Sequence, residues 1–106
     1  MPEHERELGM EIAQRQLRVT FSNGEALALT LRFGMPVPWP DETCFFCPHE
    51  ILGLPDSLIL GGYGADSLQA LQLSMNMADA RIEGWAEQHD ATVWWEENQG
   101  TGLGEM

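Results

Sequence analysis

The sequence contains no lysine, and its five basic residues are Arg6, Arg15, Arg18, Arg32 and Arg81. Against them stand 17 aspartate and glutamate residues, which give a formal net charge of -12. A charge of this sign repels nucleic acids and anionic membranes and favours cationic partners. The sequence therefore predicts neither a nucleic-acid-binding nor a membrane-binding protein. A surface selected for solubility explains the same charge equally well.

Cysteine is scarce and long apolar runs are absent. Two cysteines are too few for the disulfide framework of a small secreted domain. Residues 1–10 form a polar leader without an apolar run, so we expect neither a signal peptide nor a membrane span there. These features predict a cytoplasmic protein.

The remaining chain supplies one hydrophobic core. Its 106 residues are 43% hydrophobic, which is enough for one domain that folds without a metal or a disulfide. We predict a single α+β domain over residues 11–96. The glycine-rich segment that follows, residues 97–106, predicts a flexible tail.

Two alternating segments predict a β-hairpin. In residues 11–21 and 26–33, apolar side chains occupy every second position, as in half-buried strands. A three-residue loop that ends in a left-handed Gly24 pairs Val19 with Leu27, and both apolar sets then share one face. A two-residue loop would place them on opposite faces. We therefore predict the longer, bulged loop.

Three further strands are expected at residues 43–52, 57–60 and 91–96. Three prolines make residues 34–42 an extended connection, since proline cannot join a central ladder. For the same reason Pro48 predicts an edge strand or a bulge.

The run Gly61-Gly62-Tyr63-Gly64 predicts a tight turn before a helix. A phosphate-binding loop is the alternative, because helix N-termini bind anions. No basic residue follows the run, however, and Asp66 places a carboxylate where a phosphate would lie.

One long helix is predicted over about residues 67–87. Asp66 is a suitable N-cap, and Gln69 completes a capping-box pattern. An apolar stripe at helical spacing should pack on the sheet. The fold class is therefore α+β, an antiparallel sheet of about four to five strands with one helix on one face. The stripe consists of Leu68, Leu71, Met75, Ala78, Ile82 and Trp85.

Cys44 and Cys47 form a CxxC pattern, with His49 two residues further on. A zinc site would need a second ligand pair, and a redox site would need a helix N-terminus to activate the thiol. Residues i and i+3 of a strand also point to opposite faces. Two separate buried cysteines are the simpler interpretation. A Cys47–His49 catalytic dyad lacks an orienting acid, so we predict no catalytic residue, no metal ligand and no cofactor.

The predicted helix carries two possible interaction surfaces. Its acidic flank, a candidate surface for a basic partner, consists of Asp79, Glu83, Glu87 and Asp90. A solvated helix face would have the same pattern.

The second surface consists of Leu73 and Met77, accompanied by Ala70, Ala80 and Gly84. Small residues around two exposed hydrophobic ones would allow a second chain to approach closely, so they predict a possible homodimer.

Three segments resemble a family of small bacterial proteins of unknown function, over roughly residues 11–96. The most specific pattern is Gly-x-Asp-Ser-x-Gln-Ala-Leu-x-Leu. The resemblance implies a bacterial source and no particular activity. The segments are Gly34–Pro36, Cys47–Leu54 and Gly64–Leu73.

Two functions from different classes agree with these residues. The first is a non-catalytic protein-binding domain, such as an immunity-type or inhibitor protein that directs an acidic surface at a basic partner. The second is a small metal-binding or thiol-dependent protein centred on Cys44, Cys47 and His49. The charge favours the first, because residues 41–106 hold twelve acids and only Arg81, a formal charge of -11. An inert, self-associating accessory domain is a further binding-class hypothesis.

Overall fold

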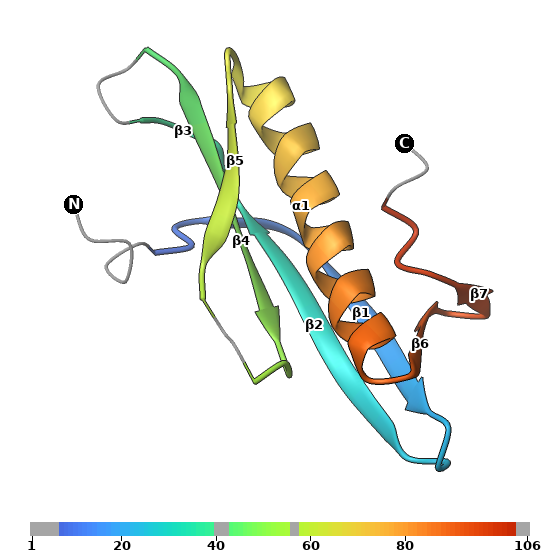
Figure 1. Ribbon diagram of the computed structural model, residues 1–106. Helices are drawn as coiled ribbons and strands as arrows, with labels where there is room; N and C mark the ends of the chain where they lie inside the picture. Colours follow the sequence, from blue (N-terminus) through green and yellow to red (C-terminus); the bar gives the residue numbers. More distant parts are fainter. Residues whose placement is uncertain (1–6, 40–42, 56–57, 104–106) are drawn as a thin grey trace.

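One antiparallel sheet with a single helix across it forms the protein (Figure 1). The computed structural model describes residues 7–39, 43–55 and 58–103. The predicted α+β class, with one helix on an antiparallel sheet, is confirmed. The sheet has seven strands, however, where four to five were predicted. In chain order the elements are β1 (Glu11–Phe21), β2 (Ala26–Gly34), β3 (Val37–Pro38), β4 (Phe45–Leu52), β5 (Leu60–Gly64), α1 (Ser67–Gln88), β6 (Ala91–Trp95) and β7 (Asn98–Gln99).

The additional strands, β3 and β7, have two residues each. Strand β3 continues the ladder of β2 along β4, since Phe33 pairs with His49 and Val37 with Phe46. Three residues separate Phe33 from Val37, whereas two separate His49 from Phe46, so the register shifts by one residue here. A strand of two residues is too short to show an alternating pattern in the sequence.

Strand β4 lies inside the sheet, so the edge position that Pro48 predicted is wrong. His49 pairs with Phe33 on one side and with Leu60 of β5 on the other. Pro48 lies beside the register shift between β2 and β3. An added Cβ at Gly34 would be 2.8 Å from Pro48 Cγ, so the two residues are in contact at this irregular point.

The predicted hairpin between β1 and β2 is confirmed. Val19 pairs with Leu27 and Leu17 with Leu29. Gly24 has a φ of 91°, in the left-handed region, as the three-residue loop requires. The apolar residues of both strands therefore face the helix together.

Helix α1 begins at the predicted cap. Asp66 Oδ1 accepts a hydrogen bond from the backbone N of Gln69 over 2.8 Å. The Gln69 side chain reaches back and accepts from the backbone N of Ala65 over 2.6 Å. The Asp66 bond is that of a capping box, whereas the reciprocal bond from Gln69 goes to the residue before the cap instead of to the cap itself.

Most of the predicted apolar stripe of α1 packs on the core, since Ala78 and Ile82 are buried and Leu71, Met75 and Trp85 are partly buried against it. Leu68 is 61% exposed, so its place in that stripe is wrong. The fully buried residues of α1 recur every four positions, and all of them are small except for one isoleucine. Such a row lets the helix lie close to the sheet. Its members are Ala70, Ser74, Ala78, Ile82 and Ala86.

Residues 98–103 pack against the domain, although the sequence predicted a flexible tail over residues 97–106. Thr101 and Leu103 are buried, and Leu103 belongs to the core. Residues 104–106 lie outside the described part of the chain.

Arg15 of β1 holds this segment. Its Nη1 donates a hydrogen bond to the backbone O of Thr101 over 2.9 Å. The guanidinium carbon lies 3.7 Å from the centre of the Trp95 ring, which is cation–π geometry. The last described residues are therefore held by contacts to both β1 and β6.

The core lies between the sheet and α1. Among the described residues, no helix is both long enough and apolar enough to cross a membrane. The core residues come from four strands, the helix and the C-terminal segment: Leu17, Val19, Leu29, Leu31, Phe33, Ile51, Ala78, Ile82, Ala86, Val93 and Leu103.

Candidate functional site

A groove of about 640 Å³ runs between β5 and the outer flank of α1, and we call it the β5–α1 groove. None of its lining residues is charged, although the chain carries a formal net charge of -12. The strand side consists of Leu60, Gly61, Gly62 and Tyr63, and the helix side of Leu73, Asn76, Met77 and Ala80.

Two glycines bring the helix onto β5. An added Cβ at Gly62 would lie 2.6 Å from the backbone N of Ser74. One at Gly64 would lie 2.4 Å from the backbone N of Ala70. Both distances are too short for a real Cβ, so the glycines permit this packing. The tight turn predicted at residues 61–64 is wrong for the same reason, because these residues form the strand that receives the helix.

Three hydrophobic side chains of the groove remain accessible. Leu73 is 40% exposed, Met77 37% and Tyr63 42%. The Tyr63 ring also packs on Phe46 of β4, with 4.9 Å between ring centres. The groove is thus a surface of exposed apolar side chains on a rigid support.

Only some of the residues of the predicted self-association surface lie together in the structure. Leu73, Met77 and Ala80 line the groove together. Ala70, however, is fully buried against the sheet and cannot frame an exposed patch. The predicted homodimer itself stays a prediction.

The predicted acidic flank is divided by the C-terminal segment. Thr101 Oγ1 donates a hydrogen bond to Asp79 Oδ1. Burial, together with the neighbouring Asp79 charge, raises the pKa of Glu83, while a backbone hydrogen bond from Thr101 lowers it. Glu87 and Asp90 remain exposed. The four carboxylates therefore do not form one open surface.

The two cysteines lie in different surroundings. Cys44, which precedes β4, donates a hydrogen bond from its thiol to the backbone O of Trp39. Cys47 is fully buried, its Sγ lies 3.4 Å from the backbone O of Gly34, and burial raises its pKa above the ordinary thiol value. No cluster of three or more His, Cys, Asp or Glu residues suited to a metal ion occurs among the described residues.

His49 is a fully buried polar residue between β4 and α1. Arg81 Nη1 lies 2.8 Å from its Nε2, and Ser74 Oγ lies 2.9 Å from its Nδ1. Arg81 can only donate, so Nε2 accepts and the proton resides on Nδ1, which donates to Ser74. Burial and the Arg81 charge lower the pKa of His49 to about 4.

This buried cluster joins His49 to Ser74, and the Cys47 thiol interacts with the same Ser74 hydroxyl. Ser74 and Cys47 are both fully buried, so neither side chain is exposed to solvent. His49 presents Nδ1–H to Ser74, which makes it a donor rather than a base toward that hydroxyl. The sequence did not predict that Ser74 and Arg81 bind His49, because neither position stands out in a helical pattern.

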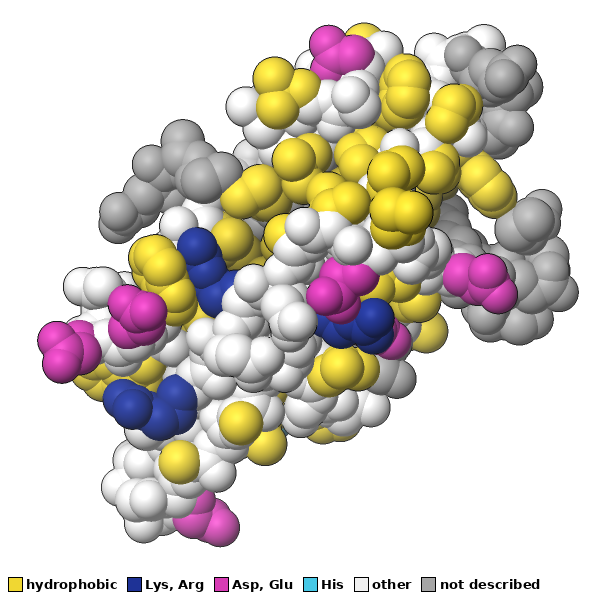
Figure 2. Space-filling view, turned by 180° about the vertical axis from the view of Figure 1, so that it is seen from behind, with side chains coloured by type: hydrophobic (Ala, Val, Ile, Leu, Met, Phe, Trp, Pro, Cys, Tyr) yellow, Lys and Arg dark blue, Asp and Glu magenta, His cyan; other side chains and the backbone are white. Residues whose placement is uncertain are grey.

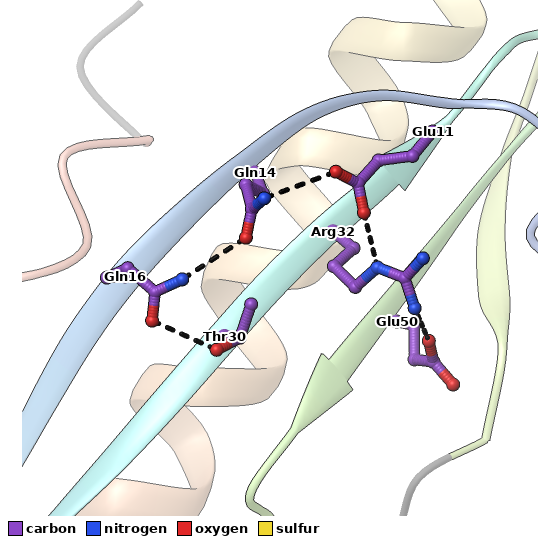
Figure 3. A network of polar contacts seen from close by, with 6 residues as sticks. All are labelled: Glu11, Gln14, Gln16, Thr30, Arg32 and Glu50. Atoms are coloured by element: carbon purple, nitrogen blue, oxygen red, sulfur yellow. Dashed lines mark hydrogen bonds and ion pairs between the residues drawn. The ribbon is translucent and has the colours of Figure 1, made fainter.

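The opposite face of the sheet carries a chain of polar contacts (Figure 3). Arg32 of β2 forms ion pairs with Glu11 of β1 and, over 3.0 Å, with Glu50 of β4. Further hydrogen bonds extend along β1 through glutamine side chains to Thr30. Each of the six labelled side chains thus has at least one partner within the sheet.

Hydrophobic side chains gather at one end of the side shown in Figure 2, the upper end, which holds β3 and β5 in Figure 1. The exposed Met35, Val37 and Tyr63 belong to these strands and the link between β2 and β3. Tyr63 is shared with the β5–α1 groove, so apolar surface is concentrated around β5.

No curated protein and no solved structure matches the chain. A protein family does match, over residues 13–105, and its description is "Domain of unknown function (DUF6968)". The match extends past the span of residues 11–96 expected from the sequence resemblance. It confirms the expectation of a family without an assigned function, and the chain belongs to this family.

Proposed function

We propose that this chain is a non-catalytic protein-binding domain and that its binding site is the β5–α1 groove. The main support is that Leu73 and Met77 are exposed in an uncharged groove, although the protein is strongly acidic. Contiguous exposed apolar surface marks interaction sites in proteins. The occupant is an apolar segment of a partner polypeptide.

The burial of Ser74 and Cys47 supports a role without catalysis. Ser74 and Cys47 are inaccessible, and both ring nitrogens of His49 are occupied by structural hydrogen bonds. The alternative, a metal-binding or thiol-dependent protein, has less support. Cys44 and Cys47 have separate hydrogen-bond partners, and His49 is turned toward α1.

The net charge supports a basic partner. Complementary potentials accelerate encounter and exclude wrong partners even when the charges lie outside the contact. An immunity-type or inhibitor protein that caps a basic partner fits this description. In this proposal the groove provides the contact, whereas exposed acidic residues elsewhere on the domain, such as Glu87 and Asp90, provide attraction at a distance.

A phage-display selection tests the groove. Random twelve-residue peptides are selected on the purified wild-type chain and depleted on a Met77→Glu variant. Leu68→Glu is the matched control, because Leu68 is exposed and apolar on the same helix but does not line the groove. We expect enriched peptides with apolar residues that bind at least tenfold more weakly to Met77→Glu and equally well to Leu68→Glu.

Three outcomes would contradict the proposal. One is the absence of any enriched peptide, and another is equal binding to both variants. The third is a stable dimer in sedimentation that Met77→Glu dissociates, since it would assign the groove to a second copy of this chain.

A further inference from the structure

We infer that the bound segment is an amphipathic α-helix with one basic end, which lies lengthwise along the outer flank of α1. This inference rests on the proposed protein-binding function. The β5–α1 groove adjoins a second hollow of about 370 Å³, since Ala80 lines both. Gly84 and Gln88 of α1 line the second hollow together with the segment that follows β4. We call the two hollows the α1 recess, and it follows the helix from Leu73 to Gln88.

The length of the α1 recess fits a helix. Residues 73 and 88 lie about 22 Å apart along α1, at the rise of 1.5 Å per residue of an α-helix. Residues of β5 line the first hollow, whereas none of them lines the second. A ligand that paired with β5 would therefore leave the second hollow empty. A helix of about 15 residues beside α1 would fill both, as in other helix-in-groove complexes.

The exposed side chains of this flank change from large to small along α1. Leu73 and Met77 are large and exposed at one end, whereas Ala80 and Gly84 are small and exposed further on. Positions with this spacing share one face of a helix. Large side chains of a ligand helix can therefore pack above Ala80 and Gly84, and smaller ones can accommodate Leu73 and Met77.

Gly84 is a glycine that the described part of the fold does not require. Glycine inside an exposed helix costs about 1 kcal/mol relative to alanine. Gly84 does not have a positive φ, and no described atom lies within 4 Å of a Cβ added there. Gly62 and Gly64, by contrast, have α1 directly against them. A ligand helix gives Gly84 a purpose, because the missing side chain lets the two backbones approach closely.

The charge along α1 determines which end of the ligand is basic. Residues 67–78 carry no charge. Further along, Arg81 is turned toward His49, and Glu87 is exposed three residues after Gly84, hence on the same flank. The last turn of α1 holds no basic residue, and the helix dipole adds negative potential there. The end of the ligand helix beside this turn is therefore basic, and the remainder of its contact face is apolar.

An alanine scan of a selected peptide tests the bound conformation. A sixteen-residue library, selected on wild type and depleted on Met77→Glu, supplies peptides long enough for both hollows. In a bound helix the contacting side chains recur every three or four positions. Alanine at these positions should weaken binding at least tenfold, and alanine at the others less than threefold. Losses at every second position would indicate an extended ligand and would contradict the helix.

A lactam bridge between positions i and i+4 on the outer side of the peptide is the second measurement. It holds the free peptide in a helix and should tighten binding at least threefold, because less freedom is lost on binding. The same peptide without ring closure is the control. Weaker binding after ring closure would also contradict the helix.

Substitution at Gly84 tests where the ligand lies. Gly84→Gln places a side chain in open space and favours the helix, so the domain should fold and bind the peptide at least tenfold more weakly. Gly84→Ala is the size control and should change binding less than threefold. Urea unfolding verifies that both variants are folded. If Gly84→Gln binds as tightly as wild type, the ligand does not follow α1.

Glu87→Gln tests the basic end. It should weaken binding at least threefold at about 0.01 M salt, and the difference should disappear at about 1 M, where the Debye length falls to about 3 Å. Asp66→Asn removes a charge at the opposite end of α1, keeps a good N-cap and should leave binding unchanged. Equal effects of the two variants would mean that no basic end lies beside Glu87. If peptides depend on Met77 but show neither helical periodicity nor sensitivity at Gly84, the helix is wrong and the groove proposal stands. If no peptide depends on Met77, both are wrong.

Discussion

Arg81 donates a hydrogen bond to Nε2 of His49 over 2.8 Å, so a cation on the helix is fastened to a neutral imidazole on β4. The contact joins α1 to the strand that pairs with β5. It therefore fixes the helix beside the edge that forms the groove. A positive charge on His49 would oppose Arg81 directly, which is one reason why burial and Arg81 together lower the His49 pKa to about 4.

The stability of the domain should depend on pH through His49. Between about pH 4 and 6.5 the unfolded chain binds a proton on this residue and the folded chain does not. The stabilisation is complete above about pH 6.5 and declines as the pH falls toward 4. From pH 7.5 to pH 5 we expect a loss of about 2 kcal/mol. Urea unfolding at both pH values measures it.

His49→Gln is the control for this prediction, since it keeps a polar side chain without the titrating proton. Carboxylates also titrate below pH 5, and they do so in both proteins. The difference between wild type and variant isolates His49. An equal loss of stability in the two proteins would show that His49 does not govern this range.

Substitution of a single glycine should separate close packing from helix propensity. Gly62→Ala places a Cβ 2.6 Å from the Ser74 backbone N, so we expect a destabilisation of about 1–3 kcal/mol. Gly84→Ala is the matched control, because nothing lies within 4 Å of its added Cβ and Gly84 is exposed in α1. It should stabilise the chain by about 0.5–1 kcal/mol. Free energies of unfolding in urea decide the matter, and a Gly62→Ala protein as stable as wild type would contradict it.

The sequence could predict elements whose pattern is local. The alternation of residues 11–21 and 26–33 determined which face each side chain occupies, and the burial of one face then required the loop that ends in Gly24. Asp66 and Gln69 satisfy amides within a few residues of themselves, so their spacing was sufficient to locate the start of α1.

The groove depended on contacts that no local pattern contains. Leu68 is more hydrophobic than Ala70, so periodicity placed Leu68 in the apolar stripe, although the structure exposes Leu68 and buries Ala70. The deciding contact is the meeting of Ala70 with Gly64, where only small residues fit. Residues 61–64 predicted a turn because they are rich in glycine, but in the structure the same glycines let them form a strand against the helix. Sequence order alone does not show that Gly64 and Ala70 meet.

Loss of the N-cap should destabilise the helix start. Asp66→Ala removes the carboxylate that accepts from the Gln69 backbone N, and such substitutions cost about 1 kcal/mol. Asp66→Asn is the matched control, since asparagine is also a good cap and should retain most of the stability. Thermal unfolding of the three proteins is the measurement. A melting temperature of Asp66→Ala equal to that of wild type would mean that the observed hydrogen bond adds no net stability.

The C-terminal segment should contribute to the core as strongly as a central strand does. Leu103 is 3% exposed and belongs to the main hydrophobic cluster, although it lies in the glycine-rich segment that predicted a flexible tail. Leu103→Ala should therefore cost about 2–4 kcal/mol, the range for a large-to-small change in a core. Leu68→Ala, which changes an exposed leucine in the same way, should cost less than about 1 kcal/mol. Urea unfolding compares the two variants. If they are equally stable, Leu103 does not pack in solution, and Asp79 and Glu83 would then be released into the open acidic flank that the sequence predicted.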